Sequence, residues 1–429
     1  MNLLMLTAGT GSFHCGTCLR DNALAQGLRG LGHHVRLVPL YLPLITDGES
    51  ASAGEDVLLG GVTAYLQQHS ALFRAMPKWV DRALDSRAVL SLVSGRAGAT
   101  DPAGLGPMTR SMLAGEEGHQ ARAIERLQES VRAITPRPDA VILSNGLLLG
   151  LVRPLERALD CPVVCTLQGE DAFLDALPDG ERDAAWALAA ERAKDVSHFI
   201  AVSAYHRDVM QARLQLTPSR VHVVHNGIDL TGFSPAEAPP SRPTIGYLAR
   251  LCAEKGLMAL VEAYIALRAT WEGPPPGLLL GGTLTALDKP VLASAYQRLA
   301  EAGVSDQLEV HPNMTLEDKQ AFLRRLSVLC VPVQVSESFG LYALEAMASG
   351  VPVVAPHRGA LPEVLEATGG GIVVEDDSPE PLAAAIIDLL LAPPKREVLA
   401  RAGRAAVIAK FGSDTMANRV ADIISEIVT

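Results

Sequence analysis

Residues 331–365 read VPVQVSESFGLYALEAMASGVPVVAPHRGALPEVL. An apolar run, a short helical stretch and a second apolar run follow one another here, which is typical of a strand–helix–strand unit. Ser338 can cap a helix that begins near Phe339 and runs to about Ala348, and Gly350 then ends that helix. Free backbone N–H groups at such a helix start favour a phosphate or the polar rim of a sugar.

Two carboxylates belong to this stretch. Glu337 lies just before the predicted helix and Glu345 about two turns into it, so their oxygens lie at different depths along one wall. Carboxylates accept hydrogen bonds from paired hydroxyl groups. For this stretch alone, the alternative is one solvated glutamate and one capping glutamate.

Short apolar runs alternate with longer amphipathic stretches along most of the chain, the pattern of a parallel sheet covered on both faces. The strands expected in the first half are 2–7, 35–40, 140–144, 163–167, 199–202 and 221–224. Those expected in the second half are 244–248, 278–280, 308–311, 328–331, 351–355 and 372–374. We predict an α/β fold of two doubly wound, Rossmann-like parallel-sheet domains that face each other across a cleft.

A proline-rich stretch divides the two halves. Residues 234–243 read SPAEAPPSRP, with four prolines in ten positions, as expected of a linker. We expect an N-terminal domain over 1–233, with a helical insertion at about 41–137, and a C-terminal domain over 244–405. A last helix is expected over 406–429, with the option of packing back on the first domain.

The composition excludes several classes of protein. The 429 residues carry 37 Lys and Arg against 48 Asp and Glu, with 4% aromatic residues, so a nucleic-acid partner is not expected. No run approaches 18 apolar residues and the start MNLLMLT carries no basic residue. We therefore expect a cytoplasmic protein without stable membrane insertion. Six cysteines are too few for a disulfide scaffold.

Two basic residues flank the first turn of the second domain, in YLARLCAEKGL. Arg250 follows a predicted strand and Lys255 opens the next helix, so both can reach the carboxyl edge of the sheet. Two fixed cations suit a diphosphate leaving group, because charge-assisted hydrogen bonds are the strong ones. In isolation, the alternative is a solvated arginine and a solvated lysine.

Together these segments resemble the family-four retaining glycosyltransferases with the GT-B fold. The resemblance is carried by VHNGID (224–229), ARLCAEKG (249–256), LLLGG (278–282) and ESFGLYALEAMASGVPVVA (337–355). It implies a retaining hexosyltransferase that moves a hexosyl unit from a nucleoside-diphosphate sugar to an acceptor, either a small molecule or a glycan. The acidic charge balance favours a soluble acceptor over one at an anionic membrane surface. The donor base, the donor sugar, the acceptor and the oligomeric state stay open.

The resemblance also implies roles for single residues. Arg250 and Lys255 would hold the diphosphate and stabilise its departure, and Glu337 would complete this catalytic set by contacting hydroxyls of the donor sugar. Glu345 would accept hydrogen bonds from the ribose. The other donor-binding residues that it implies are Gly9, Gly11, Gly281, Gly282, Phe339, Gly340 and Leu341. No cofactor and no metal are required by this chemistry, in which the nucleotide sugar is the co-substrate.

The first domain departs from the family pattern at TLQGED, residues 166–171. Gln168 stands where many members carry a histidine that contacts the donor sugar. Because an amide cannot act as a base near neutral pH, no proton role is expected there. Gln168, Glu170 and Asp171 are candidate contacts to the acceptor or the sugar, and the alternative is a solvated loop.

Cys15 and Cys18 form a C-x-x-C motif at a predicted helix start, a setting that lowers a thiol pKa. Three roles stay open for this pair: a shape-giving loop near the acceptor, a reactive thiol, or a metal site. Zinc usually needs four ligands, and the adjacent His33 and His34 do not have the spacing of a zinc finger.

Two functions of other classes also stay open. One is a non-catalytic nucleotide-sugar-binding protein, and the other is a phosphorylase or epimerase relative on the same fold. A dehydrogenase is not expected, because His14 occupies the third glycine position of a dinucleotide fingerprint that would begin at Gly9.

Overall fold

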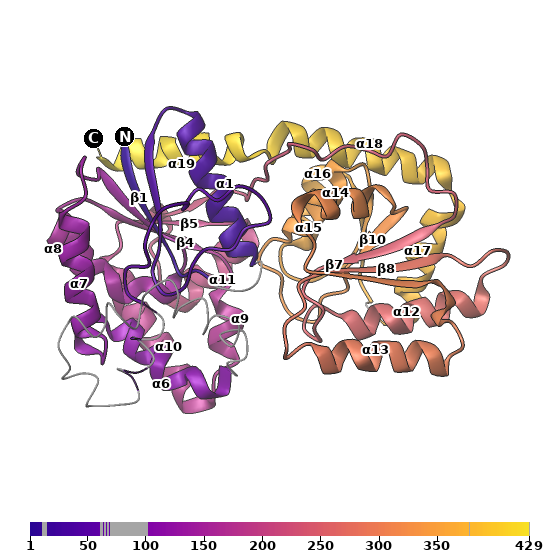
Figure 1. The fold of residues 1–429 in the computed structure, drawn as a ribbon, viewed down its shortest axis with the longest axis horizontal. Coiled ribbons are helices and arrows are strands. Elements are labelled where there is room, and N and C mark those ends of the chain that lie inside the picture. The colour runs from indigo at the N-terminus through magenta and orange to yellow at the C-terminus, as the bar shows by residue number, and fades with distance from the viewer. Residues whose placement is uncertain are drawn as a thin grey trace. The chain divides into compact units, whose positions relative to one another are not determined.

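The computed structural model describes residues 1–10, 15–60, 63, 66, 68, 102–376 and 378–428. The chain divides into two compact units (Figure 1). The first unit comprises Met1–Asn226 and Ser413–Thr429, and the second comprises Gly227–Gly412.

The sheet of the first unit has the strand order β2-β1-β3-β4-β5-β6, with parallel neighbours throughout. Its strands are β1 (Asn2–Thr7), β2 (His34–Pro39), β3 (Ala140–Leu143), β4 (Val163–Leu167), β5 (His198–Ala201) and β6 (Val221–Val223). Successive side chains of a strand point to opposite faces. Leu4 and Leu6 therefore join one hydrophobic cluster, whereas Leu3 and Met5 join another on the opposite face.

The α-helices described in the first unit are α1 (Gly16–Gly30), α6 (Pro102–Ala114), α7 (Ala121–Arg132), α8 (Val152–Leu159), α9 (Glu170–Asp175), α10 (Asp179–Arg192), α11 (Ala204–Leu214) and α19 (Ser413–Val428). α1 and α19 lie side by side (Figure 1). Gly27 permits their close approach, because a Cβ on it would lie 2.9 Å from Cβ of Ala417. The end of the chain therefore completes the first unit.

The predicted insertion over 41–137 is described only in part. Residues 41–60 contain no helix or strand, and α6 and α7 follow from residue 102 onward. Most of residues 61–101 lie outside the described residues.

The sheet of the second unit has the strand order β12-β11-β10-β7-β8-β9, again with parallel neighbours. Its strands are β7 (Thr244–Leu248), β8 (Gly277–Gly282), β9 (Leu308–Pro312), β10 (Val328–Cys330), β11 (Val353–Pro356) and β12 (Gly371–Val374). Its described α-helices are α12 (Leu257–Thr270), α13 (Lys289–Glu301), α14 (Leu316–Arg324), α15 (Leu341–Ala348), α16 (Leu361–Thr368), α17 (Pro379–Leu391) and α18 (Pro393–Lys410). The prediction of two Rossmann-like parallel-sheet domains is confirmed.

The units divide at Asn226 rather than in the proline-rich stretch 234–243. The reason is that residues 227–233 pack on the second unit: Ile228 N donates to Phe411 O at 2.9 Å, and Gln320 Nε2 donates to Thr231 O at 2.9 Å. The expected single helix over 406–429 is likewise two helices. α18 ends at Lys410 in the second unit, and α19 starts at Ser413 in the first.

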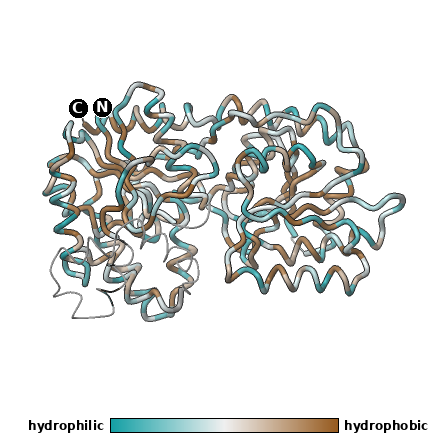
Figure 2. The backbone as a smooth tube through the Cα atoms, in the orientation of Figure 1, coloured by the Kyte–Doolittle hydropathy of each residue, from teal (hydrophilic) through white to brown (hydrophobic). Residues whose placement is uncertain are grey.

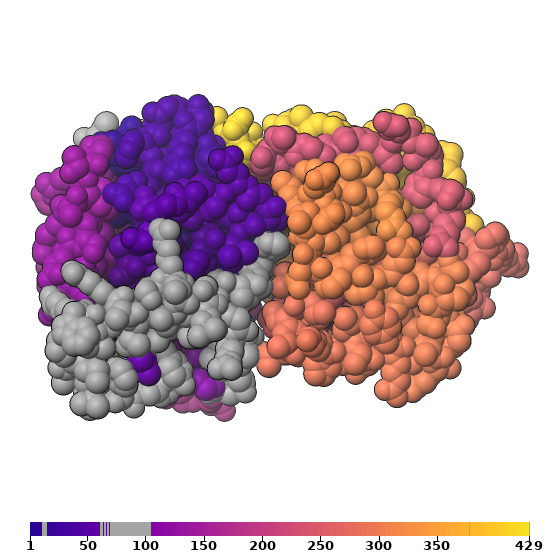
Figure 3. All heavy atoms as spheres, viewed as in Figure 1, coloured from indigo at the N-terminus to yellow at the C-terminus, as the bar shows by residue number. Residues whose placement is uncertain are grey.

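Hydrophobic residues concentrate along the strands of both sheets (Figure 2). Figure 3 shows the same side of the chain in space-filling form, coloured along the sequence. Among the described residues, none of the helices has the length and apolar character that a bilayer crossing requires.

Candidate functional site

Three adjacent strands of the second sheet carry predicted catalytic and donor-binding residues at their carboxyl ends. Glu337 follows β10, Arg250 and Lys255 follow β7, and Gly281 and Gly282 end β8. These strands are neighbours in the order β10-β7-β8. Ligands of parallel α/β sheets bind at this edge.

The helix after β10 begins later than predicted. α15 starts at Leu341 rather than near Phe339, and its N-cap is Gly340 rather than Ser338. Gly340 has a φ of 93°, a left-handed conformation that strains any residue with a Cβ. The buried Phe339 ring packs 6.2 Å from the Phe411 ring, measured between centroids. The amides at the helix start are therefore presented from Gly340 and Leu341.

Glu337 is held by the chain segment that follows β11. Ala360 N donates to Glu337 O at 2.8 Å. A Cβ on Gly359, whose φ is 61°, would lie 2.1 Å from Glu337 O and 2.4 Å from Glu337 N. Only glycine fits this contact, so Gly359 fixes the backbone of Glu337, a role that the sequence alone did not indicate.

Lys255 and Glu337 form an ion pair, with Lys255 Nζ 2.6 Å from Glu337 Oε2. The Tyr342 hydroxyl donates to the same oxygen at 3.4 Å. Gly256, with a φ of 75°, lets the loop approach, because a Cβ there would lie 1.8 Å from Pro332 O. This close approach brings the β7 loop to the β10 loop and places the pair.

Arg250 pairs with a carboxylate that the sequence patterns did not single out. Its Nε lies 2.9 Å and 3.1 Å from the two carboxylate oxygens of Asp288. Asp288 Oδ2 also accepts from Thr285 N at 3.0 Å and from Thr285 Oγ1 at 2.6 Å. Burial raises the pKa of Asp288, but the hydrogen bonds from Arg250 and Thr285 outweigh burial and hold that pKa below its usual value. The arginine side chain is 42% exposed, so its charge is held in place yet open to solvent.

Glu345 lies in an ion pair with Lys319 of α14, whose Nζ is 2.5 Å from Glu345 Oε1. Both side chains are nearly buried, at 12% and 10% exposure. The ammonium group also lies 5.9 Å from the centroid of the Phe233 ring. Lys319, which was not predicted, therefore orients the carboxylate that the family resemblance assigns to the ribose.

Gly281 and Gly282 have a packing reason that is independent of any ligand. A Cβ on Gly282, whose φ is 127°, would lie 1.9 Å from Ala249 O. A Cβ on Gly281 would lie 2.7 Å from Cε of Met314. Gly282 therefore lets the end of β8 lie against the start of the Arg250 loop, and Gly281 leaves room for Met314 and Phe322.

In the first unit, Gly9 has a φ of 76°, and a Cβ on it would lie 1.7 Å from Leu42 O. Gly9 therefore allows the turn after β1 to pack on residue 42. Gly11, predicted to bind the donor, lies outside the described residues.

Glu170 is buried at the carboxyl ends of β3 and β4. Its carboxylate accepts the N–H groups of Gly146 at 2.5 Å, Gln168 at 2.6 Å and Gly169 at 2.7 Å. Burial raises its pKa, but the His206 side chain and the backbone N–H groups reverse this effect and hold the pKa below the usual value. This geometry makes Glu170 a structural anchor of the TLQGED loop. Asp171 lies 3.8 Å from His206 Nδ1, and burial raises its pKa.

Gln168 belongs to a buried polar network around Asp21. Its Nε2 donates to Asp21 Oδ1 at 3.1 Å and to Ser144 O at 2.7 Å. Arg20 NH1 donates to the same Asp21 oxygen at 3.1 Å, and Ser144 Oγ donates to the other at 2.5 Å. Burial raises the pKa of Asp21 despite the charge of Arg20. The network fixes the orientation of the Gln168 amide.

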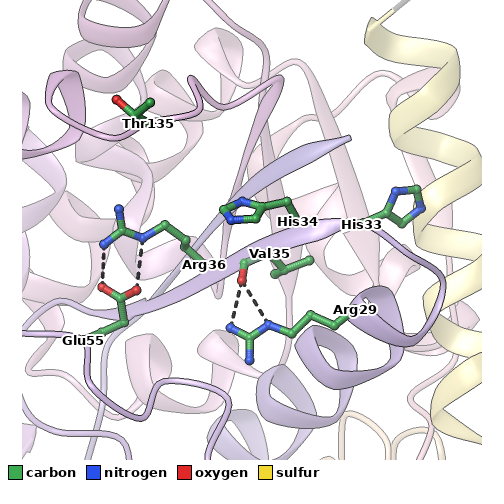
Figure 4. Close-up of a pocket in the computed structure, with 7 residues that line it drawn as sticks. All are labelled: Arg29, His33, His34, Val35, Arg36, Glu55 and Thr135. Carbon is green, nitrogen blue, oxygen red and sulfur yellow. Dashed lines mark hydrogen bonds and ion pairs between the residues drawn. The ribbon is translucent and has the colours of Figure 1, made fainter.

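A surface hollow of about 490 Å³ lies at the amino edge of the first sheet, the edge opposite the carboxyl ends of its strands (Figure 4). It is lined by Arg29, His33, His34, Val35, Arg36, Glu55 and Thr135. β2 begins there, at the amino edge of the sheet. Arg36 pairs with Glu55, and Arg29 donates to Val35 O, so these cations already have protein partners.

In the part of the chain that the structure describes, no group of three or more His, Cys, Asp or Glu side chains is placed to hold a metal ion.

Two family models match this chain over adjoining segments. Residues 82–231 match the model described as Glycosyltransferase Family 4, and residues 233–406 match that of Glycosyl transferases group 1. The chain belongs to the family-four glycosyltransferases. The Glycosyl transferases group 1 match covers Arg250, Lys255, Glu337 and Glu345 together, and the Family 4 match covers the TLQGED loop.

Similar proteins carry names that describe different reactions. The D-inositol 3-phosphate glycosyltransferase of Streptomyces griseus is 33% identical over 251 residues, which cover 52% of this chain and 52% of that protein. The alpha-maltose-1-phosphate synthase of Mycolicibacterium smegmatis is 32% identical over 253 residues, covering 53% of this chain and 62% of that protein. The chain thus matches between half and two thirds of the length of these two relatives.

Solved structures show the same GT-B fold over nearly the whole chain. The Anabaena protein HepE, in complex with UDP and glucose, has a TM-score of 0.70 at 16% identity, with 99% of both chains covered. The sucrose-phosphate synthase of Thermosynechococcus elongatus has a TM-score of 0.70 at 17% identity, also with 99% of both chains covered. At this identity the likeness is one of fold.

Proposed function

We propose that this family-four glycosyltransferase is a retaining hexosyltransferase that uses a nucleoside-diphosphate sugar. The observation that carries the proposal is the set of two oriented cations beside the α15 start at one edge of the second sheet. Lys255 is held by Glu337 and Arg250 by Asp288, at 2.6 Å and 2.9 Å. The names of similar proteins support the donor class, since one mannosyltransferase of Mycobacterium tuberculosis, 28% identical over 214 residues, is GDP-mannose-dependent.

The bound donor would place its diphosphate between Arg250 and Lys255. Both side chains are partly exposed, at 42% and 30%, so a phosphate oxygen has access to each. Their carboxylate partners hold them in position before the donor binds, which reduces the reorganisation needed during the reaction. Glu345, oriented by Lys319, would accept the ribose hydroxyls, and Glu337 would accept hydroxyls of the sugar.

In the transfer step, the bond between the anomeric carbon and the diphosphate oxygen breaks while the acceptor oxygen bonds to the same face of that carbon. The acceptor proton passes to the departing phosphate oxygen. Arg250 and Lys255 stabilise the negative charge that grows on the diphosphate. Gln168 takes no proton, because an amide is not a base at neutral pH. The acceptor, a small molecule or a glycan, is left open.

The test begins with a thermal-shift screen of UDP- and GDP-sugars, because a bound donor raises the melting temperature. With the donor found, Arg250→Ala or Lys255→Ala is expected to lower transfer by about 10²-fold or more, by analogy with the loss of one oxyanion-hole donor. Arg298→Ala is the matched control, since Arg298 is 40% exposed and pairs with Glu262 on the same unit. Near-wild-type transfer by both site variants, with unchanged circular dichroism, would refute the proposal.

Release of the nucleoside diphosphate separates the other functions. A transferase releases it when the acceptor is present, whereas a phosphorylase forms a sugar 1-phosphate from a glycoside and inorganic phosphate and releases no nucleoside diphosphate. An epimerase converts the sugar without releasing nucleotide, and a binding protein does neither.

We also propose that no metal is needed, because the two cations already supply the positive charge for the leaving group. Transfer should therefore be unchanged within error after EDTA treatment and gel filtration. A loss that Mg²⁺ or Mn²⁺ restores would contradict this part of the proposal.

A further inference from the structure

The first turn of α1 carries two thiols that glycosyl transfer does not use. Cys15 is the N-cap of α1 and has the extended backbone angles φ −121° and ψ 136°. Leu19 N donates to Cys15 O at 3.0 Å, so the helix starts at this residue. Cys18, three positions later, is 3% exposed, whereas Cys15 is partly exposed. Residues three apart at a helix start lie on the same side.

Cys18 is the neighbour that most affects the pKa of Cys15. Its thiol, as a hydrogen-bond donor, lowers the pKa of Cys15 to about 6; burial opposes this effect, and the backbone N–H groups of Cys18 and Thr17 add to it. The pKa of Cys18 moves the opposite way, because the same interaction, burial and the charges of Cys15 and Asp21 all raise it. One partner is thus a thiolate near neutral pH and the other remains a thiol.

The other four cysteines have no such arrangement. Burial raises the pKa of Cys161 and Cys252 to about 11 and that of Cys330 to about 12, and it raises the pKa of Cys165 well above its usual value. All six cysteines are free of disulfides. Among the six cysteines, the combination of a lowered and a raised thiol pKa is therefore found at the start of α1.

We propose that Cys15 and Cys18 form a thiol–disulfide exchange site for low-molecular-weight disulfides, with Cys15 as the attacking residue and Cys18 as the resolving residue. The partly exposed Cys15 meets the incoming disulfide, and the buried Cys18 follows it three residues later in the first turn of α1. An attacking thiolate beside a resolving thiol is the arrangement that exchange chemistry requires. Because Cys15 precedes the helical residues, closing the bond does not unwind α1.

The exchange has two balanced steps. The Cys15 thiolate attacks one sulfur of the small disulfide, forms a mixed disulfide and expels one thiolate, which takes up a proton. The Cys18 thiol then loses its proton, attacks the Cys15 sulfur and expels the second thiolate, which is protonated in turn. Two protein thiols are oxidised to one disulfide, and one small disulfide is reduced to two thiols.

The experiment equilibrates the reduced full chain in buffers of glutathione and glutathione disulfide. Acid quenching, alkylation of the remaining thiols and peptide mass analysis then follow each cysteine. The peptide with Cys15 and Cys18 should lose two hydrogens and escape alkylation, whereas Cys161, also partly exposed, is alkylated throughout. The oxidised fraction should fall from about nine tenths to about one tenth over a roughly 100-fold rise in the ratio of squared thiol to disulfide concentration, as expected for a two-electron couple.

Single variants assign the order of attack. Cys18→Ser should trap a glutathione adduct on Cys15, and Cys15→Ser should leave Cys18 unmodified. Full alkylation of both wild-type cysteines at every ratio would overturn the proposal, and so would an adduct on Cys18 in Cys15→Ser. The wild-type measurement needs no variant to fold and no glycosyl transfer, so its failure is distinct from failure of the proposed function.

Discussion

Lys319 and Glu345 show how a single contact decides what a residue can do. Glu345 alone on a helix could turn its carboxylate in several directions, but an ammonium 2.5 Å from Oε1 fixes the orientation of that carboxylate. Both side chains are nearly buried, so solvent screens this pair little. The residue pair therefore acts as one acceptor group.

Glu345→Gln is expected to weaken binding of the free nucleoside diphosphate by about 10-fold, because a hydrogen bond to a charged group contributes about 1.5–3 kcal/mol. Calorimetric titration with UDP or GDP measures this. Glu309→Gln is the control, since Glu309 pairs with Arg325 on the surface of the same unit. Equal affinity of Glu345→Gln and the wild type would remove the ribose role.

Cys15 is expected to react with iodoacetamide far faster than Cys161. Its lowered pKa of about 6 means that the thiolate is present above that pH and is lost as the pH falls through it, whereas the thiolate of Cys161 forms only near pH 11. At pH 7 the thiolate fraction of Cys15 exceeds that of Cys161 by about 10⁴. The Cys15 thiolate is less basic and therefore less nucleophilic by a factor of about 200. The expected rate of Cys15 is thus about 50 times that of Cys161.

Mass-resolved alkylation rates between pH 5 and pH 8 check this expectation. The rate of Cys15 should rise to a plateau above about pH 7, while that of Cys161 keeps rising. Parallel profiles for the two residues would contradict it.

At the scale of elements, the loop between β10 and α15 is shaped by glycines that lie far away in the sequence. Gly359 touches the backbone of Glu337, and Gly256 touches Pro332. Each contact joins the ends of two neighbouring strands. The position of Glu337 is therefore determined by contacts with the loops of the neighbouring strands, and not by its own loop alone.

Comparing Gly359→Ala with Gly303→Ala separates the cost of a left-handed backbone from the cost of a steric clash between the new methyl group and Glu337. Gly303→Ala is its matched control, because Gly303 has a φ of 69° but no atom within 4 Å of the place where a methyl group would lie, whereas Gly359 has a φ of 61° and its methyl group would lie 2.1 Å from Glu337 O. We expect the control to cost about 1 kcal/mol of unfolding free energy and Gly359→Ala about 2–3 kcal/mol more. Urea denaturation measures both free energies of unfolding. Equal costs would show that the loop between β10 and α15 can move away from the methyl group without loss of stability.

The strand pattern was predictable, because buried parallel strands are continuous apolar runs and each run here is bounded by turn residues. The start of α15 was predicted wrongly: Ser338 has the right side chain for a cap, but the loop continues to Gly340, which caps the helix in a left-handed conformation that glycine adopts without strain. Asp288 and Lys319 were missed for another reason. Their partners, Arg250 and Glu345, lie far along the chain, and no local pattern marks such a pair.

At the scale of the whole molecule, the first unit is discontinuous in sequence. α19 buries Met416, Ala417, Val420 and Ile424, each at most 2% exposed, in a cluster that includes Leu24 and Leu28 of α1. Full burial of one large apolar side chain contributes about 1.5–3 kcal/mol. The summed contribution of Met416, Val420 and Ile424 is therefore comparable with much of the free energy of unfolding of a typical domain.

A chain that ends at Gly412 is therefore expected to lose the cooperative unfolding of the first unit while the second unit remains folded. Hydrogen exchange resolved by peptide should show loss of protection in β1 and α1 and unchanged protection in β7 and β8. Met416→Ala in the full chain should give a milder version of the same effect, of about 2–5 kcal/mol. Retained protection in β1 and α1 of the truncated chain would show that α19 is dispensable.

Because α19 comes last, ribosomal synthesis delivers the second unit as an unbroken segment before the first unit has all its parts. Until α19 emerges from the ribosome, the apolar side of α1 has no permanent cover, and it would be exposed to chaperones or to other nascent chains. Completion of the N-terminal sheet therefore waits for synthesis of α19, and a premature stop just after Gly412, before α19, would damage the half of the protein that was made first.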